Sequence, residues 1–167
     1  MKTYVITLSK AFMRGHQKDG MPTGFEEKIK SGQKIHTIRG NVPFWEKRIR
    51  EIQEGSAILS IRQWTGKPYR SKQREIARLT SEDGIGIERI ILSRSEWAEN
   101  SEPHFCYWAT IEGNEVDIET IARHDGFPDT SDFLMWFDPE INRQNPDEDG
   151  WKHLEAAILH FTKFRYQ

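Results

Sequence analysis

The sequence predicts an α+β domain built on a mixed or antiparallel β-barrel with short flanking helices. About six short segments have the composition of strands, and roughly two to four have helix start signals. Strands and helices do not alternate as in βαβ units, and no internal repeat is present. With 167 residues, the chain is expected to form one domain, with loop insertions near residues 10–22, 94–104 and 138–150.

The first elements are predicted to be a strand, a long loop and a short helix. Residues 2–8 alternate as strand residues do, whereas residues 10–22 contain Gly, Pro and basic residues typical of a loop. Thr23 and Glu26 have the spacing of a capping box, in which the threonine oxygen accepts a backbone N–H and the glutamate reaches back. This spacing predicts a helix over residues 24–31.

A strand and a second helix are expected next. Gly32 stands where a left-handed C-terminal cap is usually glycine, and residues 34–39 are predicted to be a strand. Pro43 is suited to the first turn of a helix that ends at Gly55. Helical spacing places three apolar side chains on one face of that helix: Trp45, Ile49 and Ile52.

The rest of the chain is predicted to be mainly strands and loops. Strands are expected at 57–64, 73–79, 85–92, 105–111 and in the closing segment 154–166, joined by polar loops that include 94–104. Asp117 is expected to cap a helix at 118–124, and Ser131 another at 132–137. The acidic residues 138–150 are expected to be irregular.

Composition limits the class of protein. No segment approaches the roughly 18 consecutive apolar residues of a membrane span, and the short apolar start does not have the pattern of a signal peptide. The single cysteine, Cys106, excludes an internal disulfide. Its apolar neighbours predict a buried thiol in a cytoplasmic protein.

The net charge of −2 conceals a strong asymmetry between the two halves of the chain. Residues 1–80 contain 17 Lys and Arg against 7 Asp and Glu, whereas residues 81–167 contain 7 against 19. Two interpretations stay open: the halves pair with one another across the fold, or the basic half faces phosphates or another anionic ligand.

The segment Gly32-Gln33-Lys34-Ile35-His36-Thr37-Ile38-Arg39 resembles the signature of the ASCH family, in which glycine, lysine and arginine recur at this spacing after a short helix. Three further segments look like this family: 64–69 (WTGKPY), 121–127 (IARHDGF) and 158–166 (ILHFTKFRY). The resemblance implies a PUA-like mixed β-barrel. It also implies a cleft beside the signature strand and a role in RNA or nucleoside chemistry.

Thr37 makes the chain similar to one subgroup within the family, because many family members have glutamate at this position. A threonine is similar to the N(4)-acetylcytidine amidohydrolase subgroup, which combines a lysine, a threonine and a downstream acid. Lys34 and Thr37 match the first two by position, and Asp125 is the nearest equivalent of the acid. The resemblance implies that Thr37 is the nucleophile, Lys34 the base and acid, and Asp125 an orienting or proton-donating carboxylate.

The chemistry of these residues makes a geometric demand. A threonine hydroxyl is a weak nucleophile until a base takes its proton, and a lysine serves only if burial or a cation such as Arg39 lowers its pKa. Thr37 and Arg39 share a face of a regular strand, but Lys34 would point to the other face, about 10 Å away. The site therefore requires a bend near Gly32. A Lys34–Thr37 contact beside an acid would favour catalysis.

Arg39 and five further residues are candidates for contacts to RNA or a nucleoside. The polar connection after strand 57–64 mixes aromatic and basic side chains, which suits base stacking and phosphate contacts. An ordinary basic hairpin and a solvated first loop are the alternatives. The five are Trp64, Lys67, Tyr69 and Arg70 at this connection, and His16 in the first loop.

The sequence predicts no metal and no cofactor. His104 and Cys106 have no second ligand pair at zinc spacing. The acidic residues after Asn145 begin like a calcium loop but lack its closing glutamate, because Ala156 stands there. The expected partner is RNA or a modified nucleoside, without a membrane. A non-catalytic RNA-binding module and a metal-independent ribonuclease remain alternative functions, and the oligomeric state stays open.

Overall fold

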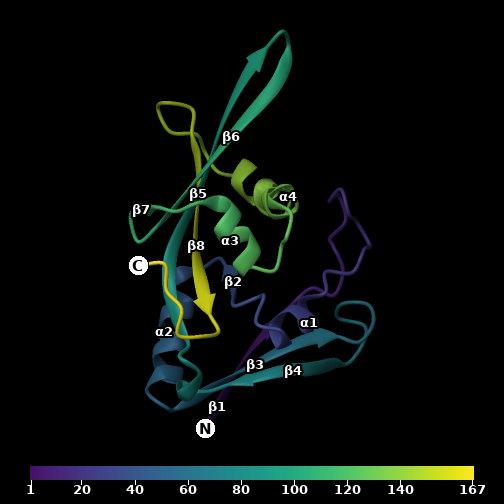
Figure 1. Cartoon of the computed structure of the whole chain (residues 1–167), viewed down its shortest axis with the longest axis vertical. Coiled ribbons are helices and arrows are strands. Elements are labelled where there is room, and N and C mark those ends of the chain that lie inside the picture. Colours follow the sequence, from purple (N-terminus) through teal and green to yellow (C-terminus); the bar gives the residue numbers. More distant parts are fainter.

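The computed structural model describes all of residues 1–167, which form an α+β fold with two β-sheets (Figure 1). The helices are α1 (Phe25–Lys30), α2 (Val42–Gln53), α3 (Ile118–His124) and α4 (Thr130–Asn142), and a short 3-10 helix covers Ser81–Asp83. The strands are β1 (Lys2–Thr7), β2 (His36–Arg39), β3 (Ala57–Trp64), β4 (Gln73–Leu79), β5 (Gly86–Glu99), β6 (Glu102–Ile111), β7 (Asn114–Glu115) and β8 (Lys152–His160).

The smaller sheet comes from the basic half of the chain. Its order is β1-β3-β4, with β1 parallel to β3 and β4 antiparallel to β3. Helix α2 connects this sheet to the larger one, and its predicted apolar face is confirmed because Trp45, Ile49 and Ile52 are all buried. The helix begins with Pro43 in its first turn, as expected.

The larger sheet is antiparallel throughout and has the order β2-β8-β5-β6-β7. The signature strand β2 is therefore an edge strand that pairs with β8, with Thr37 opposite Leu159. Helices α3 and α4 lie beside the long strands β5 and β8 (Figure 1). One hydrophobic cluster of 26 buried residues includes members of both sheets.

The expected single closed barrel is not formed. β2 pairs with the C-terminal strand β8 and has no ladder to β1, so the two sheets remain separate. Packing across the shared core, rather than hydrogen bonding around a ring, holds the sheets together.

The prediction of a loop at residues 94–104 is wrong. These residues extend β5 and β6 into a hairpin arm that projects at the top of Figure 1. Asn100 and Ser101 form its two-residue turn, and both have the positive φ that such tight hairpin turns require. Polar composition suggested a loop, but cross-strand pairing of Trp97 with His104 continues the ladder.

Three local expectations also need correction. The capping box is absent, because the Thr23 hydroxyl donates to the Ser9 carbonyl at 2.8 Å and Gly24 is the N-cap of α1. Helix α4 is capped by Asp129 and runs to Asn142, beyond the expected 132–137. Cys106 is exposed, because it lies on the hairpin arm that projects from the rest of the fold. None of the helices combines the length and apolar composition that crossing a bilayer requires.

Candidate functional site

The bend that Lys34 requires is present at the end of α1. Gly32 has a φ of 79°, and the Lys34 backbone N–H donates to the Lys28 carbonyl at 2.9 Å, so Lys34 belongs to the turn. Strand β2 begins two residues later. The turn directs the Lys34 side chain into the same cavity that Thr37 lines.

Lys34 forms a buried ion pair with Asp125, which follows α3. Its Nζ donates to the Asp125 carbonyl at 2.6 Å and to Oδ1 at 3.0 Å. The two side chains are only 2% and 4% exposed. Gly126 has a φ of 90°, and a Cβ there would lie 3.1 Å from Lys34 Cδ. Glycine thus permits the close approach of the two chain segments.

Burial and charge shift the pKa values of Lys34 and Asp125 in opposite directions. Burial lowers the pKa of Lys34, and the Asp125 carboxylate only partly offsets it. Burial raises the pKa of Asp125, but the charges of Lys34 and His36 outweigh burial and hold that pKa below its usual range. The Phe25 ring, 4.4 Å from Nζ, favours the ammonium form. Asp125 accepts two of the three N–H donors of an ammonium, which leaves one position free.

Thr37 and Arg39 share a face, as their spacing predicts. An Arg39 Nη1 hydrogen is donated to Thr37 Oγ1 at 3.1 Å. Arg39 also donates to the carbonyls of Ile38 and Thr7, and no carboxylate lies within ion-pair distance of it. The Thr37 hydroxyl is buried and has no acceptor for its own hydrogen. No hydrogen bond joins Lys34 to Thr37.

A small cavity brings the predicted catalytic residues together. Its volume of about 20 Å³ holds about one water molecule. Lys34, Thr37, Arg39 and Asp125 form its polar lining. The remaining lining residues are Leu8, Ser9, Phe25, Ile38, Phe127, Trp136 and Phe137.

The first loop is anchored to the start of helix α4, mainly at Asp132. Lys18 and Gln17 both donate to the buried Asp132 carboxylate, and His16 Nε2 donates to the Asp132 carbonyl at 2.9 Å. His16 Nδ1 accepts the Lys18 backbone N–H, so neither ring nitrogen is free. His16 therefore has a structural role in anchoring the first loop, and its ligand contact stays a prediction.

An outer hollow of about 380 Å³ lies between the first loop and the hairpin that joins β3 to β4. Trp64 and Arg14 line it, and Ser9 lines both this hollow and the inner cavity. The rings of Trp64 and Tyr69 have centroids 5.2 Å apart, and Tyr69 is 90% exposed. Lys67 and Arg70 are exposed on the same hairpin, whereas neither lines the inner cavity.

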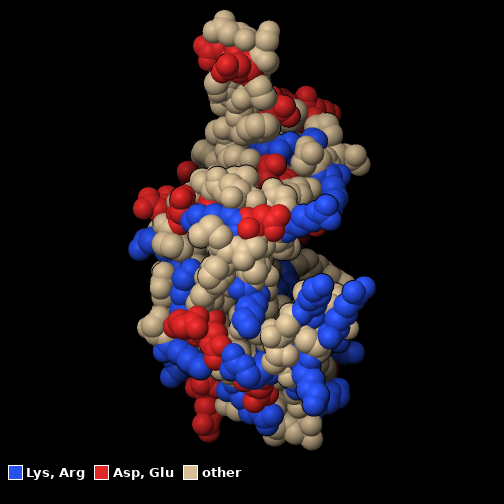
Figure 2. Space-filling view, turned by 90° about the vertical axis from the view of Figure 1, so that its right-hand side faces the viewer, with Lys and Arg blue, Asp and Glu red and all other residues tan.

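Few ion pairs join the basic half of the chain, residues 1–80, to the acidic half, residues 81–167. Three Lys or Arg to Asp or Glu pairs join them: Lys18–Asp132, Lys34–Asp125 and Arg89–Glu46. Most of the positive excess is thus left on the surface, which favours the interpretation that the basic half faces an anion. Figure 2 shows Lys and Arg gathered over the lower part of one face, below an acidic tip.

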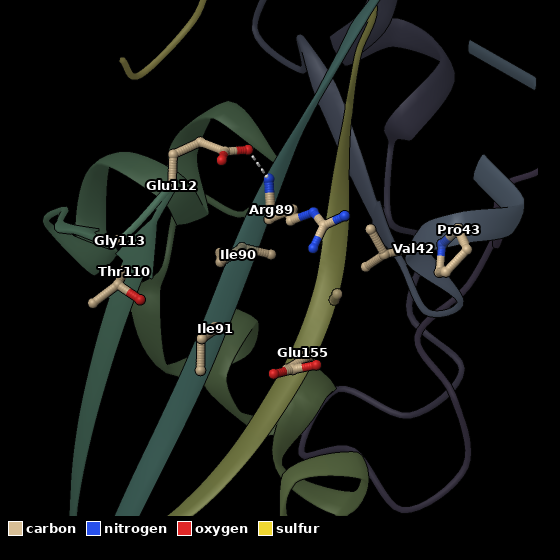
Figure 3. Close-up of a pocket in the computed structure, with 10 residues that line it drawn as sticks. Val42, Pro43, Arg89, Ile90, Ile91, Thr110, Glu112, Gly113 and Glu155 are labelled. Carbon is tan, nitrogen blue, oxygen red and sulfur yellow. Dashed lines mark hydrogen bonds between the residues drawn. The ribbon is translucent and has the colours of Figure 1, made fainter. Parts of the chain in front are cut away.

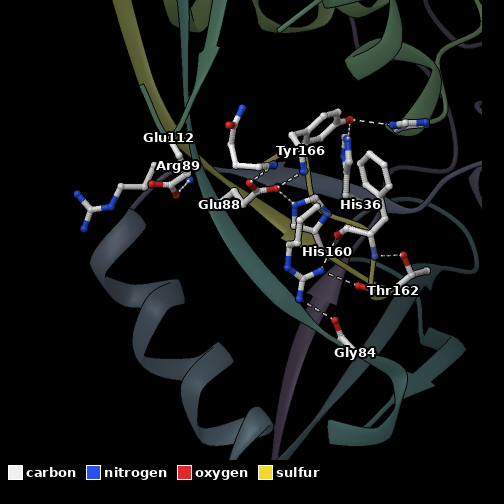
Figure 4. Close-up of polar contacts among 12 residues, drawn as sticks. His36, Gly84, Glu88, Arg89, Glu112, His160, Thr162 and Tyr166 are labelled. Atoms are coloured by element: carbon white, nitrogen blue, oxygen red, sulfur yellow. Dashed lines mark hydrogen bonds and ion pairs between the residues drawn. The ribbon is translucent and has the colours of Figure 1, made fainter. Parts of the chain in front are cut away.

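Sequence reasoning missed a buried network around Tyr166. Its hydroxyl contacts His36 Nε2 at 2.8 Å and His124 Nδ1 at 2.9 Å (Figure 4). His160 Nε2 contacts Glu88 Oε1 at 2.7 Å, and Glu88 also accepts the backbone N–H of Tyr166. His36 Nδ1 lies 3.4 Å from Asp125 Oδ1, which links the network to the site. Its members lie too far apart in the chain for any local pattern.

Replacing Tyr166 with phenylalanine is expected to lower the free energy of unfolding by about 1–3 kcal/mol, because it leaves buried His36 Nε2 without a partner. Burial also holds the pKa values of His36 and His124 below the ordinary value. The unfolded chain then binds more protons than the folded one, so stability should fall as pH drops through about 6.5. Urea titrations across this range measure both effects, and an acid-insensitive midpoint would contradict the second.

A further hollow lies away from the predicted site residues. A hollow of about 330 Å³ on the larger sheet is lined by Glu112, Glu155 and Arg89, among others, and none of the predicted site residues borders it (Figure 3). No group of three or more His, Cys, Asp or Glu side chains is placed to hold a metal ion.

No protein-family model, curated protein or solved structure matches the chain.

Proposed function

We propose that this chain is an ASCH-type, PUA-like protein that binds RNA or a modified nucleoside and hydrolyses the amide of an acylated cytidine. One observation carries the proposal: a buried Lys34–Asp125 pair shares a cavity with a Thr37 hydroxyl that has no acceptor for its hydrogen. Hydroxyl, amine and acid are the groups that acyl transfer needs.

The first step transfers the acyl group to the protein. Neutral Lys34 takes the Thr37 hydroxyl proton, and Oγ1 attacks the acyl carbonyl carbon. Arg39, which already donates to Oγ1 at 3.1 Å, stabilises the negative charge that develops next to it. Lys34 then gives its proton to the exocyclic nitrogen, the C–N bond breaks, and cytidine leaves an acyl ester on Thr37.

The second step restores the site. Water attacks the ester, Lys34 accepts one water proton, and Thr37 recovers it as the carboxylic acid departs. One amide and one water thus yield one amine and one acid. Asp125 holds the lysine amine through two contacts, which fixes the direction of the remaining position at Nζ.

A nucleoside fits this site only if the inner cavity widens. A cavity of about 20 Å³ is too small for a nucleoside, but Ser9 separates it from the outer hollow of about 380 Å³. The base would occupy the outer hollow beside Trp64, and its acyl group would pass Ser9 toward Thr37. Displacement of Ser9 would join the two hollows and bring Lys34 and Thr37 into contact with the acyl group, because catalytic contacts often tighten only with substrate.

Incubation of the protein with N(4)-acetylcytidine, followed by chromatography, tests this function. Cytidine and acetate should appear in equal amounts without added metal. Absence of product with acetylated nucleoside and with an acetylated RNA oligonucleotide would contradict hydrolysis.

The second candidate is a non-catalytic RNA-binding module. The exposed hairpin cations Lys67 and Arg70, next to Tyr69, favour it because they form no ion pair. Under this function the protein retains RNA with no product. Cleavage of single-stranded RNA without metal would instead identify a ribonuclease.

The K67A/R70A variant is expected to bind single-stranded RNA more weakly, whatever the RNA sequence. Each lost phosphate contact removes about 0.7 from the slope of log K against log salt, so the slope should shrink by about 1.4. Fluorescence anisotropy over several salt concentrations measures it. A matched variant, K2A/R78A, removes two cations of the same sheet that are already paired with glutamates, and should change the slope little.

A further inference from the structure

A separate hollow of about 330 Å³ lies on the larger sheet at the base of the hairpin arm. Ser93 of β5 lines it. The next residue, Arg94, donates to Asp138 and Asn142 of α4, so strand alternation turns Ser93 to the opposite face of the sheet. The complete lining is Ser93, Trp108, Asp147, Trp151 and His153, and none of these residues belongs to the site around Lys34.

The sheet register brings three of these side chains together. Ser93 pairs with His153 of β8 on one side and with Trp108 of β6 on the other, so the three side chains project from one face. Asp147 and Trp151 come from the loop that leads from α4 into β8 (Figure 1). Ser93 and His153 are 60 positions apart in the chain, so no local pattern in the sequence indicated this cluster.

Ser93, His153 and Asp147 form a continuous hydrogen-bonded chain. Ser93 Oγ lies 2.6 Å from His153 Nδ1, and His153 Nε2 lies 2.8 Å from Asp147 Oδ2. An ionised carboxylate can only accept, so the neutral imidazole carries its proton on Nε2 and donates it to Asp147. Nδ1 is then the acceptor for the Ser93 hydroxyl hydrogen. Hydroxyl, imidazole and carboxylate in this order are the groups that activate a serine as a nucleophile.

The loop before β8 fixes the position of the Asp147 carboxylate. Its second oxygen, Oδ1, accepts the backbone N–H groups of Asp149 and Trp151, both at 2.9 Å. The hydrogen bond from His153 and those from these backbone groups hold the pKa of Asp147 below its usual range, so the carboxyl is ionised at neutral pH. It is thus placed to orient His153 and to stabilise the imidazolium that forms when His153 takes a proton.

The lining suits a neutral aromatic substrate. Trp108 and Trp151 offer indole rings against which another aromatic ring can pack. Asp147, Glu148 and Asp149 make the adjoining loop acidic, which disfavours nucleotides and other anions. A volume of about 330 Å³ accommodates a small molecule, whereas a serine that served only to fasten the loop would need no hollow beside it.

We propose that Ser93, His153 and Asp147 form a second catalytic site, which hydrolyses short-chain esters of phenols. Ser93 Oγ attacks the ester carbonyl carbon while its proton passes to His153 Nδ1. His153 returns this proton to the phenolic oxygen as the C–O bond breaks, so a phenol leaves and the acyl group remains on Ser93. Water then attacks the acyl group with the help of His153 and releases the carboxylic acid. One ester and one water give one phenol and one acid.

The hydrogen-bond donors of the hollow explain why an aryl ester, rather than an amide, is the substrate. The indole N–H groups of Trp108 and Trp151 have no acceptor within the fold and can donate to the oxygen that becomes negative. Because no hydrogen bond fixes these indoles, they stabilise that charge less than a rigid pair of backbone donors would. A phenol is a good leaving group, so its esters need less of this stabilisation than an amide does.

Labelling with a fluorophosphonate, which phosphonylates activated serines, tests the nucleophile. Peptide mass spectrometry should locate an adduct on Ser93 of the wild-type protein. D147N keeps the size of the side chain but removes the charge that orients His153, and it should slow the labelling about tenfold or more. The matched control S95A removes a hydroxyl two residues along the same strand face, which contacts no histidine, and should leave the labelling of Ser93 unchanged.

Turnover of p-nitrophenyl acetate tests catalysis. An exposed histidine hydrolyses this ester slowly by itself, and S93A, which retains His153 and Asp147, measures that background. The wild-type rate should exceed the S93A rate about tenfold or more. Because the adduct is assigned to a residue by its peptide mass, the result does not depend on the reactivity of Thr37. Absence of an adduct on Ser93, labelling of D147N as fast as wild type, or equal turnover by wild type and S93A would each overturn the proposal.

Discussion

Replacement of Asp125 by alanine is expected to destabilise the fold by about 3–5 kcal/mol, because it leaves the Lys34 ammonium buried without its counter-charge. Both side chains are almost completely buried, at 2% and 4% exposed, so water cannot replace the lost contacts. Urea unfolding followed by tryptophan fluorescence measures the change. A D125A midpoint equal to that of the wild type would contradict a stabilising role for the pair.

A double variant separates lost charge pairing from lost packing. K34M/D125A removes both charges and should recover part of the stability lost in D125A, because no unpaired ion remains. In D125A alone, the lowered Lys34 pKa means that the unfolded chain binds more protons than the folded chain. Stability of D125A should therefore rise with pH toward the ordinary lysine pKa of about 10.4.

The wild-type pair adds a second pH dependence, at acidic pH. The folded-state pKa of Asp125 is held below its usual range, so its contribution is present above the ordinary value of about 3.9 and is lost as pH falls below it. D125A should lack this acid-side loss, which gives the comparison an internal control.

Thr37→Val is expected to reduce hydrolysis of N(4)-acetylcytidine by about 10³-fold or more, because loss of a nucleophile removes the covalent route. Valine has nearly the shape of threonine. Arg39 Nη1 keeps its second acceptor, the Ile38 carbonyl at 3.0 Å, so the strand should remain in place. Initial rates at saturating substrate measure the effect.

Two controls decide the role of the hydroxyl. Thr37→Ser retains an oxygen at the same position and should keep most of the activity, whereas Lys34→Ala should lose it. Nucleoside binding to T37V should remain close to wild type, because the proposed function places the base in the outer hollow, away from Thr37. Equal turnover by wild type and Lys34→Ala would eliminate the assigned mechanism.

Elements defined by local signals were predictable from the sequence. Strands β3 and β4 occupy residues 57–64 and 73–79, as expected, and Asp117 caps α3 as its position predicts. These features depend on alternation, turn residues and capping within a few positions. The hairpin arm was not predictable in this way, because its polar strands form through pairing with one another rather than through burial of one face.

The residues of the candidate site likewise fall into those that local spacing predicted and those that it could not predict. Lys34, Thr37 and Arg39 lie within six positions, so spacing alone required the bend that the structure contains. Asp125 is 91 positions from Lys34, and only the family resemblance suggested it. Nothing local indicated that Asp132 anchors the first loop or that Tyr166 joins two histidines, because both depend on tertiary packing.

The division of charge between the two sheets gives the molecule an electric dipole. β1, β3 and β4 come from the half with 17 cationic residues, whereas β5 to β8 come from the half with 19 acidic ones. In the field of a polyanion such a molecule turns before it makes contact, with the β3–β4 hairpin leading and the acidic arm trailing. Under the proposed function, diffusion thus delivers the outer hollow to the nucleic acid.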